Sequence, residues 1–217
     1  MAVASCFLFF YLFFAIPPNA ADDASALVSM QKRYASVETI SGSFRLYYRD
    51  FGMEQVDSGI FWLKKPSLMK WEYEKPRGQL FVANGEESFL YVPQDNQVTV
   101  QPLNEADLRN SPLEFLLGSG DIRDDYLVAS EPESEAKFGE NHVLRLIPKR
   151  SDPDYAFFIL EIDRETFDLR RLFMQEHTGS NLEYRFYDLK TDVTVGDEMF
   201  QFKIPPKTEV LRMEKAE

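Results

Sequence analysis

The chain has 217 residues and a formal net charge of −12, which argues against nucleic acid and against anionic membrane as its main partner. Aromatic residues make up 14% of the sequence, a high share for an acidic protein, so these rings must be buried or covered. Nothing in the middle of the sequence resembles a linker, and the length suits one domain with a sizeable core.

Residues 1–21 have the pattern of a secretory signal peptide. The run from Phe7 to Ile16 is almost wholly apolar and is followed by prolines and small residues. It is too short to span a bilayer comfortably, although an uncleaved membrane anchor is the alternative. The single cysteine, Cys6, lies in this leader and precedes most of the apolar run, so it is poorly placed for lipidation. Residues 22–217 are therefore expected to form one secreted domain without disulfide or thiol chemistry.

An amphipathic helix is expected directly after the leader, with Asp22 or Asp23 as its cap. Its apolar positions recur at steps of three and four residues: Leu27, Met30, Tyr34 and Val37. From Gly42 onward the apolar period changes to two, which predicts strands. Their ranges are 42–49, 55–64, 67–75, 79–84, 87–92 and 97–102. Asn84-Gly85 is a hairpin signal between two of them.

Two short helices interrupt this meander, at 104–108 and at 111–118, the second with Ser, Pro and Gly at the positions that favour a start and a stop. Strands are then expected at 126–129, 142–148, 157–163, 169–175, 182–189 and 200–204. The sequence therefore predicts a mainly β fold with α: an incomplete, strongly curved antiparallel β-barrel of about 11–12 strands, covered by a helical lid.

Catalytic chemistry has few candidates. The two histidines, His142 and His177, fall at a strand start and in a turn, and acidic pairs such as Asp124-Asp125 fall where carboxylates cap and solubilise. We therefore expect no enzyme activity, no cofactor and no metal site. A cleft that held two of these carboxylates at working distance would revive a hydrolase hypothesis, which ranks third.

The segment 64–76 has an aromatic and sulfur-containing face. Met69, Trp71 and Tyr73 fall on one side of an extended chain, and charged residues fall on the other. One such strand is usually the face of an ordinary core. Several strands of this kind in a secreted protein also suit a sheet that holds an apolar ligand.

Several motifs follow the amphipathic helix in a fixed order. They are Ser41-Gly42-Ser43-Phe44, Gly59-Ile60-Phe61-Trp62-Leu63-Lys64-Lys65-Pro66, Lys70-Trp71-Glu72-Tyr73-Glu74-Lys75-Pro76, Leu80-Phe81-Val82-Ala83-Asn84-Gly85, Leu90-Tyr91, the Ser111-Pro112 helix and Phe200-Gln201-Phe202-Lys203-Ile204-Pro205. In this order they resemble the LolA family of periplasmic carriers for outer-membrane lipoproteins. The resemblance implies an incomplete barrel whose helical lid encloses an apolar cavity.

The resemblance also implies location and partners. The chain is then a monomeric carrier in the periplasm of a Gram-negative bacterium. It would receive acylated lipoproteins from the inner-membrane ABC transporter of the Lol system and pass them to an outer-membrane lipoprotein acceptor. A lipid-binding or lipoprotein-sensing regulatory module of the same fold, or a transporter of another lipid, is the alternative.

Two positions depart from the family's pattern. Lys65 stands where the family usually has an arginine that is implied to hold the lid closed and to matter for cargo acceptance; the alternative is a solvated basic residue at a strand end. Met69 stands where an aromatic residue is common.

An apolar cavity would be lined by one face of each strand. Trp62 is an alternative lining residue to Phe61 and Leu63, because alternation does not tell which face looks inward. The expected cavity lining is Phe44, Leu46, Phe61, Leu63, Met69, Trp71, Tyr73, Phe89, Tyr91, Leu113, Phe115 and Leu116.

Overall fold

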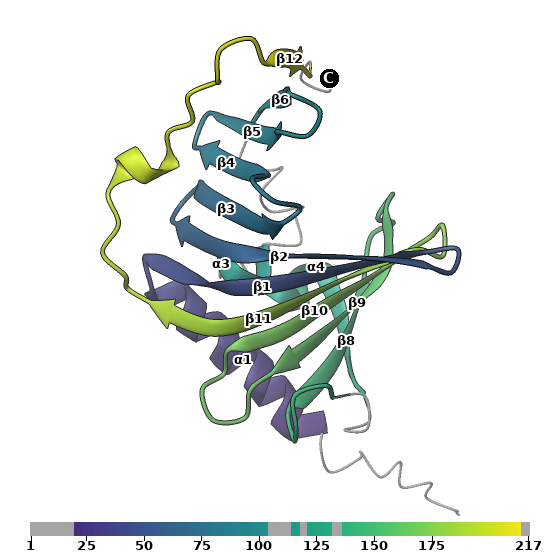
Figure 1. The fold of residues 1–217 in the computed structure, drawn as a ribbon. Helices are drawn as coiled ribbons and strands as arrows, with labels where there is room; N and C mark the ends of the chain where they lie inside the picture. Colours follow the sequence, from purple (N-terminus) through teal and green to yellow (C-terminus); the bar gives the residue numbers. More distant parts are fainter. Residues whose placement is uncertain (1–19, 104–113, 118–120, 132–135, 214–217) are drawn as a thin grey trace, which may run out of the picture.

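The computed structural model describes residues 20–103, 114–117, 121–131 and 136–213. Within these residues the chain forms one sheet of twelve strands in the order β12-β6-β5-β4-β3-β2-β1-β11-β10-β9-β8-β7 (Figure 1). The pairs are antiparallel except for β12 beside β6. The mainly β prediction is confirmed. The sheet stays open, with β12 and β7 at its two edges, and does not curl as strongly as the barrel prediction expected.

The first seven elements are α1 (Ala20–Ser36), β1 (Thr39–Asp50), β2 (Met53–Lys64), β3 (Leu68–Lys75), β4 (Leu80–Asn84), β5 (Glu87–Val92) and β6 (Gln97–Pro102). The middle ones are α3 (Glu114–Leu117), α4 (Ile122–Asp125), β7 (Tyr126–Ser130) and β8 (His142–Pro148). The last are β9 (Tyr155–Ile162), β10 (Leu169–Glu176), β11 (Asn181–Thr191), the 3-10 helix η2 (Asp197–Phe200) and β12 (Glu209–Arg212). Every predicted strand except the last is present, with small shifts at the ends. The predicted helix at 104–108 lies outside the described residues, and α3 is the described part of the helix predicted at 111–118.

Helix α1 packs its apolar stripe against the sheet, as its periodicity predicted. Leu27, Met30 and Tyr34 are fully buried. The helix begins at Ala20, so Asp22 and Asp23 lie in its first turn and do not cap it. Carboxylates are favourable in this turn because the helix dipole places positive charge there.

Local turn chemistry sets the register of two hairpins. The β1–β2 turn has positive φ at both Phe51 and Gly52, 42° and 83°, which matches the twist of the flanking strands. In the β4–β5 turn the Asn84 side chain accepts hydrogen bonds from the main-chain N–H groups of Glu86 and Glu87, at 2.9 and 2.8 Å. The hairpin predicted at Asn84-Gly85 is confirmed.

The chain after β11 forms a strap, residues 192–208, that runs past β3 and β4 before β12 joins the sheet beside β6 (Figure 1). The prediction of a strand at 200–204 is wrong, because Phe200 ends η2 and the next residues form no strand. Phe200 is fully buried, and Phe202 packs on Phe89 and Tyr91, with ring centroids 5.5 and 5.8 Å apart. Phe200 and Phe202 pack on the sheet. The apolar residues of this segment therefore alternate as in a strand, although the segment is not hydrogen-bonded as one.

Candidate functional site

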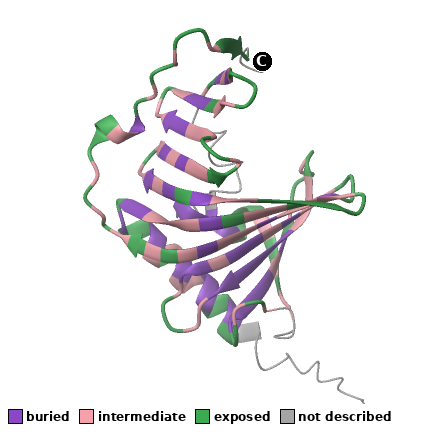
Figure 2. Ribbon diagram, viewed as in Figure 1, coloured by how far each residue is buried: buried purple, intermediate pink, exposed green. Residues whose placement is uncertain are grey.

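The apolar residues of the sheet gather on the face covered by α1 and α3, which we call the inner face. Figure 2 shows the buried residues concentrated in the central strands and in α1, with exposed residues at the hairpin tips and in β12. One contiguous buried cluster, the inner cluster, joins this face to the two helices. It contains most of the sequence-predicted lining residues, in full or partly buried: Phe44, Leu46, Phe61, Leu63, Met69, Trp71, Tyr73, Phe115 and Leu116.

Aromatic rings form the centre of the inner cluster. Phe61 stacks on Trp71 with centroids 4.7 Å apart and an interplanar angle of 17°. Phe44 meets Trp71 edge-on at 4.8 Å. On the helical side, Phe115 of α3 meets Phe158 of β9 edge-on at 5.7 Å. Helix α3 therefore packs on the sheet through apolar contacts, which have no strict directional requirement.

Two predicted lining residues lie elsewhere. Phe89 pairs with Val82 across β4–β5, which places both on the outer face, opposite the inner cluster. Phe89 and Tyr91 belong to a separate small cluster with Phe202. Alternation along β5 could not reveal this, because both faces of the strand carry apolar residues and the strap covers the outer one. The remaining predicted residue, Leu113, lies outside the described residues.

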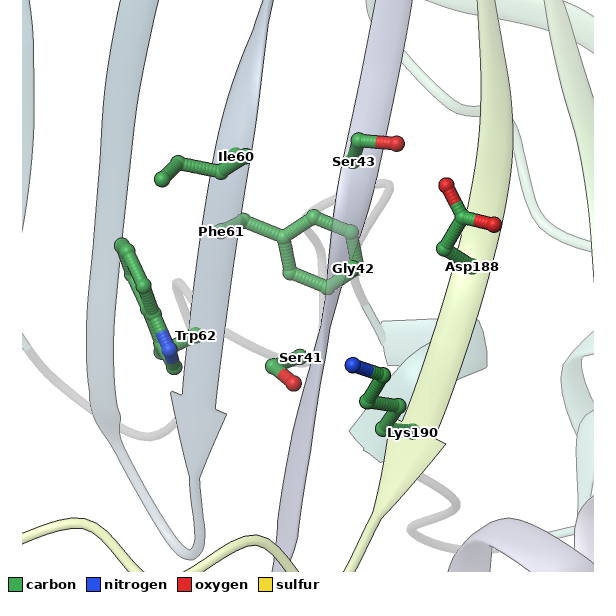
Figure 3. A pocket seen from close by; sticks show the side chains of 8 residues that line it. All are labelled: Ser41, Gly42, Ser43, Ile60, Phe61, Trp62, Asp188 and Lys190. Atoms are coloured by element: carbon green, nitrogen blue, oxygen red, sulfur yellow. The ribbon is translucent and has the colours of Figure 1, made fainter.

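Trp62 also faces outward, whereas Phe61 and Leu63, the residues on either side of it, are buried in the inner cluster. Trp62 is one of the residues that line a depression over β1, β2 and β11 (Figure 3). The volume of this depression is about 310 Å³. The depression is lined by Ser41, Gly42, Ser43, Ile60, Phe61, Trp62, Asp188 and Lys190. A second hollow of about 300 Å³ shares three of these residues, Ser43, Ile60 and Asp188. Both are lined by polar and apolar residues, whereas the inner cluster is apolar.

The inner cluster also contains residues that sequence reasoning missed. They come from the second half of the chain, and they include Phe158, Leu160, Leu172, Met174, Tyr184 and Phe186. The sequence pattern that could have identified them is the alternation of apolar residues within β9, β10 and β11. This alternation predicted the strands, but it was not extended to the residues that line the inner face. The pairing of β11 with β1 brings Phe186 opposite Phe44 and Tyr184 opposite Leu46, so the two halves form one continuous floor.

Lys65 lies between the sheet and α1. Its ammonium donates to the main-chain carbonyl of Tyr34, in the last turn of the helix. Burial lowers the pKa of Lys65, and the nearby Asp192 carboxylate opposes this effect. Two further contacts hold the same end of α1: Arg33 binds Asp168 at 2.7 Å, and the Tyr34 hydroxyl accepts from the Leu169 N–H at 2.9 Å. Lys65 therefore fastens α1, and its role as a latch for cargo remains a prediction.

Lys64, the residue before Lys65, binds the strap. The Lys64 ammonium contacts the Asp197 carboxylate at 2.5 Å and the Val195 carbonyl at 3.5 Å, which ties the strap to the end of β2. Two neighbouring lysines thus fasten α1 and the strap: Lys64 is the last residue of β2, and Lys65 is the first residue of the turn that follows.

The carboxylates and histidines proposed as alternatives are spread over the molecule. His142 begins β8, as predicted, and its Nδ1 lies 2.8 Å from the Asp23 carboxylate in a buried contact. Asp125 pairs with Arg150 at 2.7 Å, and Asp152 accepts from main-chain N–H groups in its turn. Among the described residues no three His, Cys, Asp or Glu side chains are placed to hold a metal ion. Within the same residues, no helix has the length and apolar character needed to cross a membrane.

Comparison with known proteins relates this geometry to a family. Residues 35–203 match the family model described as outer membrane lipoprotein carrier protein LolA. An outer-membrane lipoprotein carrier protein from Chromohalobacter salexigens is 28% identical over 201 residues, covering 91% of this chain and 92% of its own. A protein of the same name from Pseudomonas aeruginosa is 27% identical over 194 residues, covering 88% and 90%.

A solved structure agrees with the fold. An uncharacterized conserved protein from Thermus thermophilus superposes with a TM-score of 0.56 at 13% identity, over 88% of this chain and 99% of that one. At this identity the likeness concerns the arrangement of the sheet and helices alone.

Proposed function

Because the chain belongs to the LolA family of outer-membrane lipoprotein carrier proteins, whose members are periplasmic carriers and not enzymes, we propose that it carries acylated lipoproteins across the periplasm. The acyl chains would bind between the inner face of the sheet and the layer formed by α1 and α3. The carrier would act as a monomer, receive its cargo from an inner-membrane ABC transporter and deliver it to an outer-membrane acceptor.

The observation that carries this proposal is the inner cluster. Nine residues chosen from the sequence as an acyl-chain lining converge in it, from β1, β2, β3 and α3. The cluster lies between the sheet and two helices, α1 and α3, whose apolar side chains are part of it. Acyl chains could replace those contacts with similar ones, because apolar packing depends on buried area more than on direction.

The energetics of the task require such a shield. A triacylated cysteine has on the order of 40 methylenes, and at about 0.8 kcal/mol each their exposure to water would cost roughly 30 kcal/mol. The carrier must offset most of this and still release its cargo. Loading is therefore expected to need an ATP-consuming partner, and delivery is expected to run toward a stronger binder.

Photo-crosslinking tests where the chains bind. The full chain is produced with its leader, purified from the periplasm, and incubated with spheroplasts that contain a radiolabelled triacylated lipoprotein. Benzoylphenylalanine replaces Phe115 in the helical layer or, as a matched aromatic control, Trp62 on the outer face. We expect a soluble one-to-one complex and a crosslink to the acyl chains from position 115 alone.

Other outcomes would change the conclusion. Equal crosslinking from both positions would place the chains outside the inner cluster. Co-purification of free phospholipid without release of lipoprotein would favour a lipid-binding or sensing module, or a transporter of another lipid. Failure of the unsubstituted protein to release any lipid would refute the carrier function.

A further inference from the structure

The indole N–H of Trp71 is a buried hydrogen-bond donor that finds no acceptor among the described residues. Only 3% of Trp71 is exposed, and among the described residues its Nε1 atom has no hydrogen-bond partner. Native proteins satisfy the great majority of their buried polar groups, since an unpaired one destabilises the fold. A donor of this kind points to an acceptor that enters the site from outside the chain.

The surrounding rings hold this donor in place. Phe61 stacks on the indole, and Phe44 and Tyr184 meet it edge-on with centroids at 4.8 and 5.8 Å. An aromatic face accepts an N–H group only weakly, so these contacts fix its direction without replacing a true acceptor. The indole is thus oriented for a ligand and can discriminate between ligands with and without a well-placed oxygen.

Two tyrosines place further donors next to it. Tyr73 follows Trp71 on the same face of β3 and meets Phe44 edge-on at 5.1 Å. Tyr184 approaches from β11 on the other side of Phe44, through the β1–β11 pairing. Neither hydroxyl makes a hydrogen bond to the part of the chain that the structure describes.

The electrostatic surroundings keep both hydroxyls protonated. Burial, with Asp57 as the second cause, raises the pKa of Tyr73 to about 12. Burial also raises the pKa of Tyr184, and the nearby Tyr73 and Tyr155 hydroxyls and the Asp57 carboxylate add to this effect. Both groups are therefore neutral donors at physiological pH.

These donors lie where the inner face changes from apolar to polar. Leu63 and Met69 form the paired row on one side of Trp71 and are almost fully buried. On the other side, Leu46 pairs with Asp57, whose carboxylate accepts from Gln55 at 3.0 Å. The order along the face is an apolar floor, then hydrogen-bond donors, then a charged rim.

An acylglycerol has the same order of groups. Its hydrocarbon chains are apolar, its ester carbonyls accept hydrogen bonds and donate none, and its head is polar. We propose that Trp71, Tyr73 and Tyr184 form a donor site for the ester carbonyl oxygens of an acylglycerol group. The site rests on the proposed function but goes further, because the carrier then recognises the glyceryl esters as well as the chains.

The test compares ester with ether. The probes are a diacylglyceryl-cysteine lipopeptide, its dialkyl ether analogue with equal chain lengths, and a phospholipid with the same ester chains. The purified protein is titrated with each in detergent below its micellar concentration. We expect the wild type to bind the ester lipopeptide about tenfold more tightly than the ether, the effect of about one net hydrogen bond.

Three single variants remove the donors. Tyr73→Phe and Tyr184→Phe keep the ring, and Trp71→Phe replaces the indole with a smaller ring that has no donor. We expect the two tyrosine variants to weaken ester binding several-fold and to leave ether binding unchanged. We expect Trp71→Phe to weaken ester binding more than ether binding, because it also removes part of an aromatic ring. Tyr47→Phe, on the outer face, is the matched control and should leave both unchanged. The infrared carbonyl band of a carbon-13-labelled ester adds a readout that packing does not affect: it should move to lower frequency in the wild type and less in each variant.

The outcomes separate this inference from the proposed function. Equal binding of ester and ether, or equal loss of both in the variants, overturns the donor site while the carrier function stands. If the protein binds neither the ester nor the ether lipopeptide and releases no lipoprotein, both the donor site and the carrier function are overturned. Tight binding of the ester phospholipid as well as the ester lipopeptide supports a site for acylglycerols in general. Tight binding of the ester lipopeptide alone supports the same site with lipoprotein as its source.

Discussion

The Lys65 ammonium donates a hydrogen bond to the main-chain carbonyl of Tyr34, and so joins the end of β2 to the last turn of α1. Carbonyls at the end of a helix lack intrahelical partners and carry the negative end of its dipole, so a cation is favourable there. The contact fastens one end of the helix that covers the inner cluster. It therefore connects the stability of the fold with the opening that cargo would require.

Removing this contact should loosen α1 without unfolding the sheet. We expect Lys65→Met to lower the free energy of unfolding by about 1 kcal/mol and Lys65→Arg to keep most of it, because the guanidinium can still donate. Urea denaturation and amide exchange in the last turn of α1 measure the two effects. Lys75→Met is the matched control, since Lys75 also precedes a proline but is exposed. Equal losses in both Met variants would argue against the contact.

Alkaline pH should weaken the inner cluster through its tyrosines. The pKa of Tyr73 is raised to about 12, mainly by burial, whereas an unfolded tyrosine ionises near pH 10. Between these values the unfolded state binds fewer protons than the folded one, so stability falls as pH rises from about 10 to about 12. The loss from this residue is up to about 3 kcal/mol. Urea unfolding at several pH values in this window gives the free energy of unfolding as a function of pH. This free energy should fall less steeply with pH in Tyr73→Phe than in the wild type, and an equal fall in both would contradict the assignment.

Glu161 anchors a loop on the outer face from a fully buried position. Its carboxylate accepts from the Lys137 and Phe138 N–H groups at 2.9 and 2.8 Å, and from Asn141 and Arg171 at 3.0 Å. Glu161→Ala should destabilise the fold by about 3–5 kcal/mol, since it removes a carboxylate beside a buried guanidinium. Glu161→Gln keeps one acceptor oxygen and should lose less. Thermal and urea unfolding measure the stability of the two variants. Equal stability of Glu161→Ala and Glu161→Gln would contradict the role of the carboxylate.

Gly59 lies at a β-bulge where β2 approaches β3 closely. A Cβ at this position would collide with the Glu72 carbonyl oxygen and lie 3.0 Å from the Phe44 ring. We expect Gly59→Ala to destabilise by about 3 kcal/mol, at the high end for overpacking, because main-chain atoms cannot move aside cheaply. Ser58→Ala is the neighbouring control and should change stability little. A well-folded Gly59→Ala protein of wild-type stability would show that the bulge can shift.

Local patterns sufficed for most elements of this fold. The steps of three and four residues predicted the buried stripe of α1, the period of two predicted β1 to β11, and Asn84-Gly85 predicted its hairpin. These features depend on residues close in sequence, whose side-chain directions follow from the backbone period. The same patterns identified most of the first half of the inner cluster.

Tertiary structure decided what the patterns left open. Only the pairing of β4 with β5 and the packing of the strap placed Phe89 on the outer face, and only the β1–β11 pairing brought Tyr184 beside Trp71. The partner of Lys65 lies 31 residues away in α1. An alternating strand has two possible orientations, and long-range contacts determine which face is buried, so the sequence alone determined the elements and the tertiary structure determined the site.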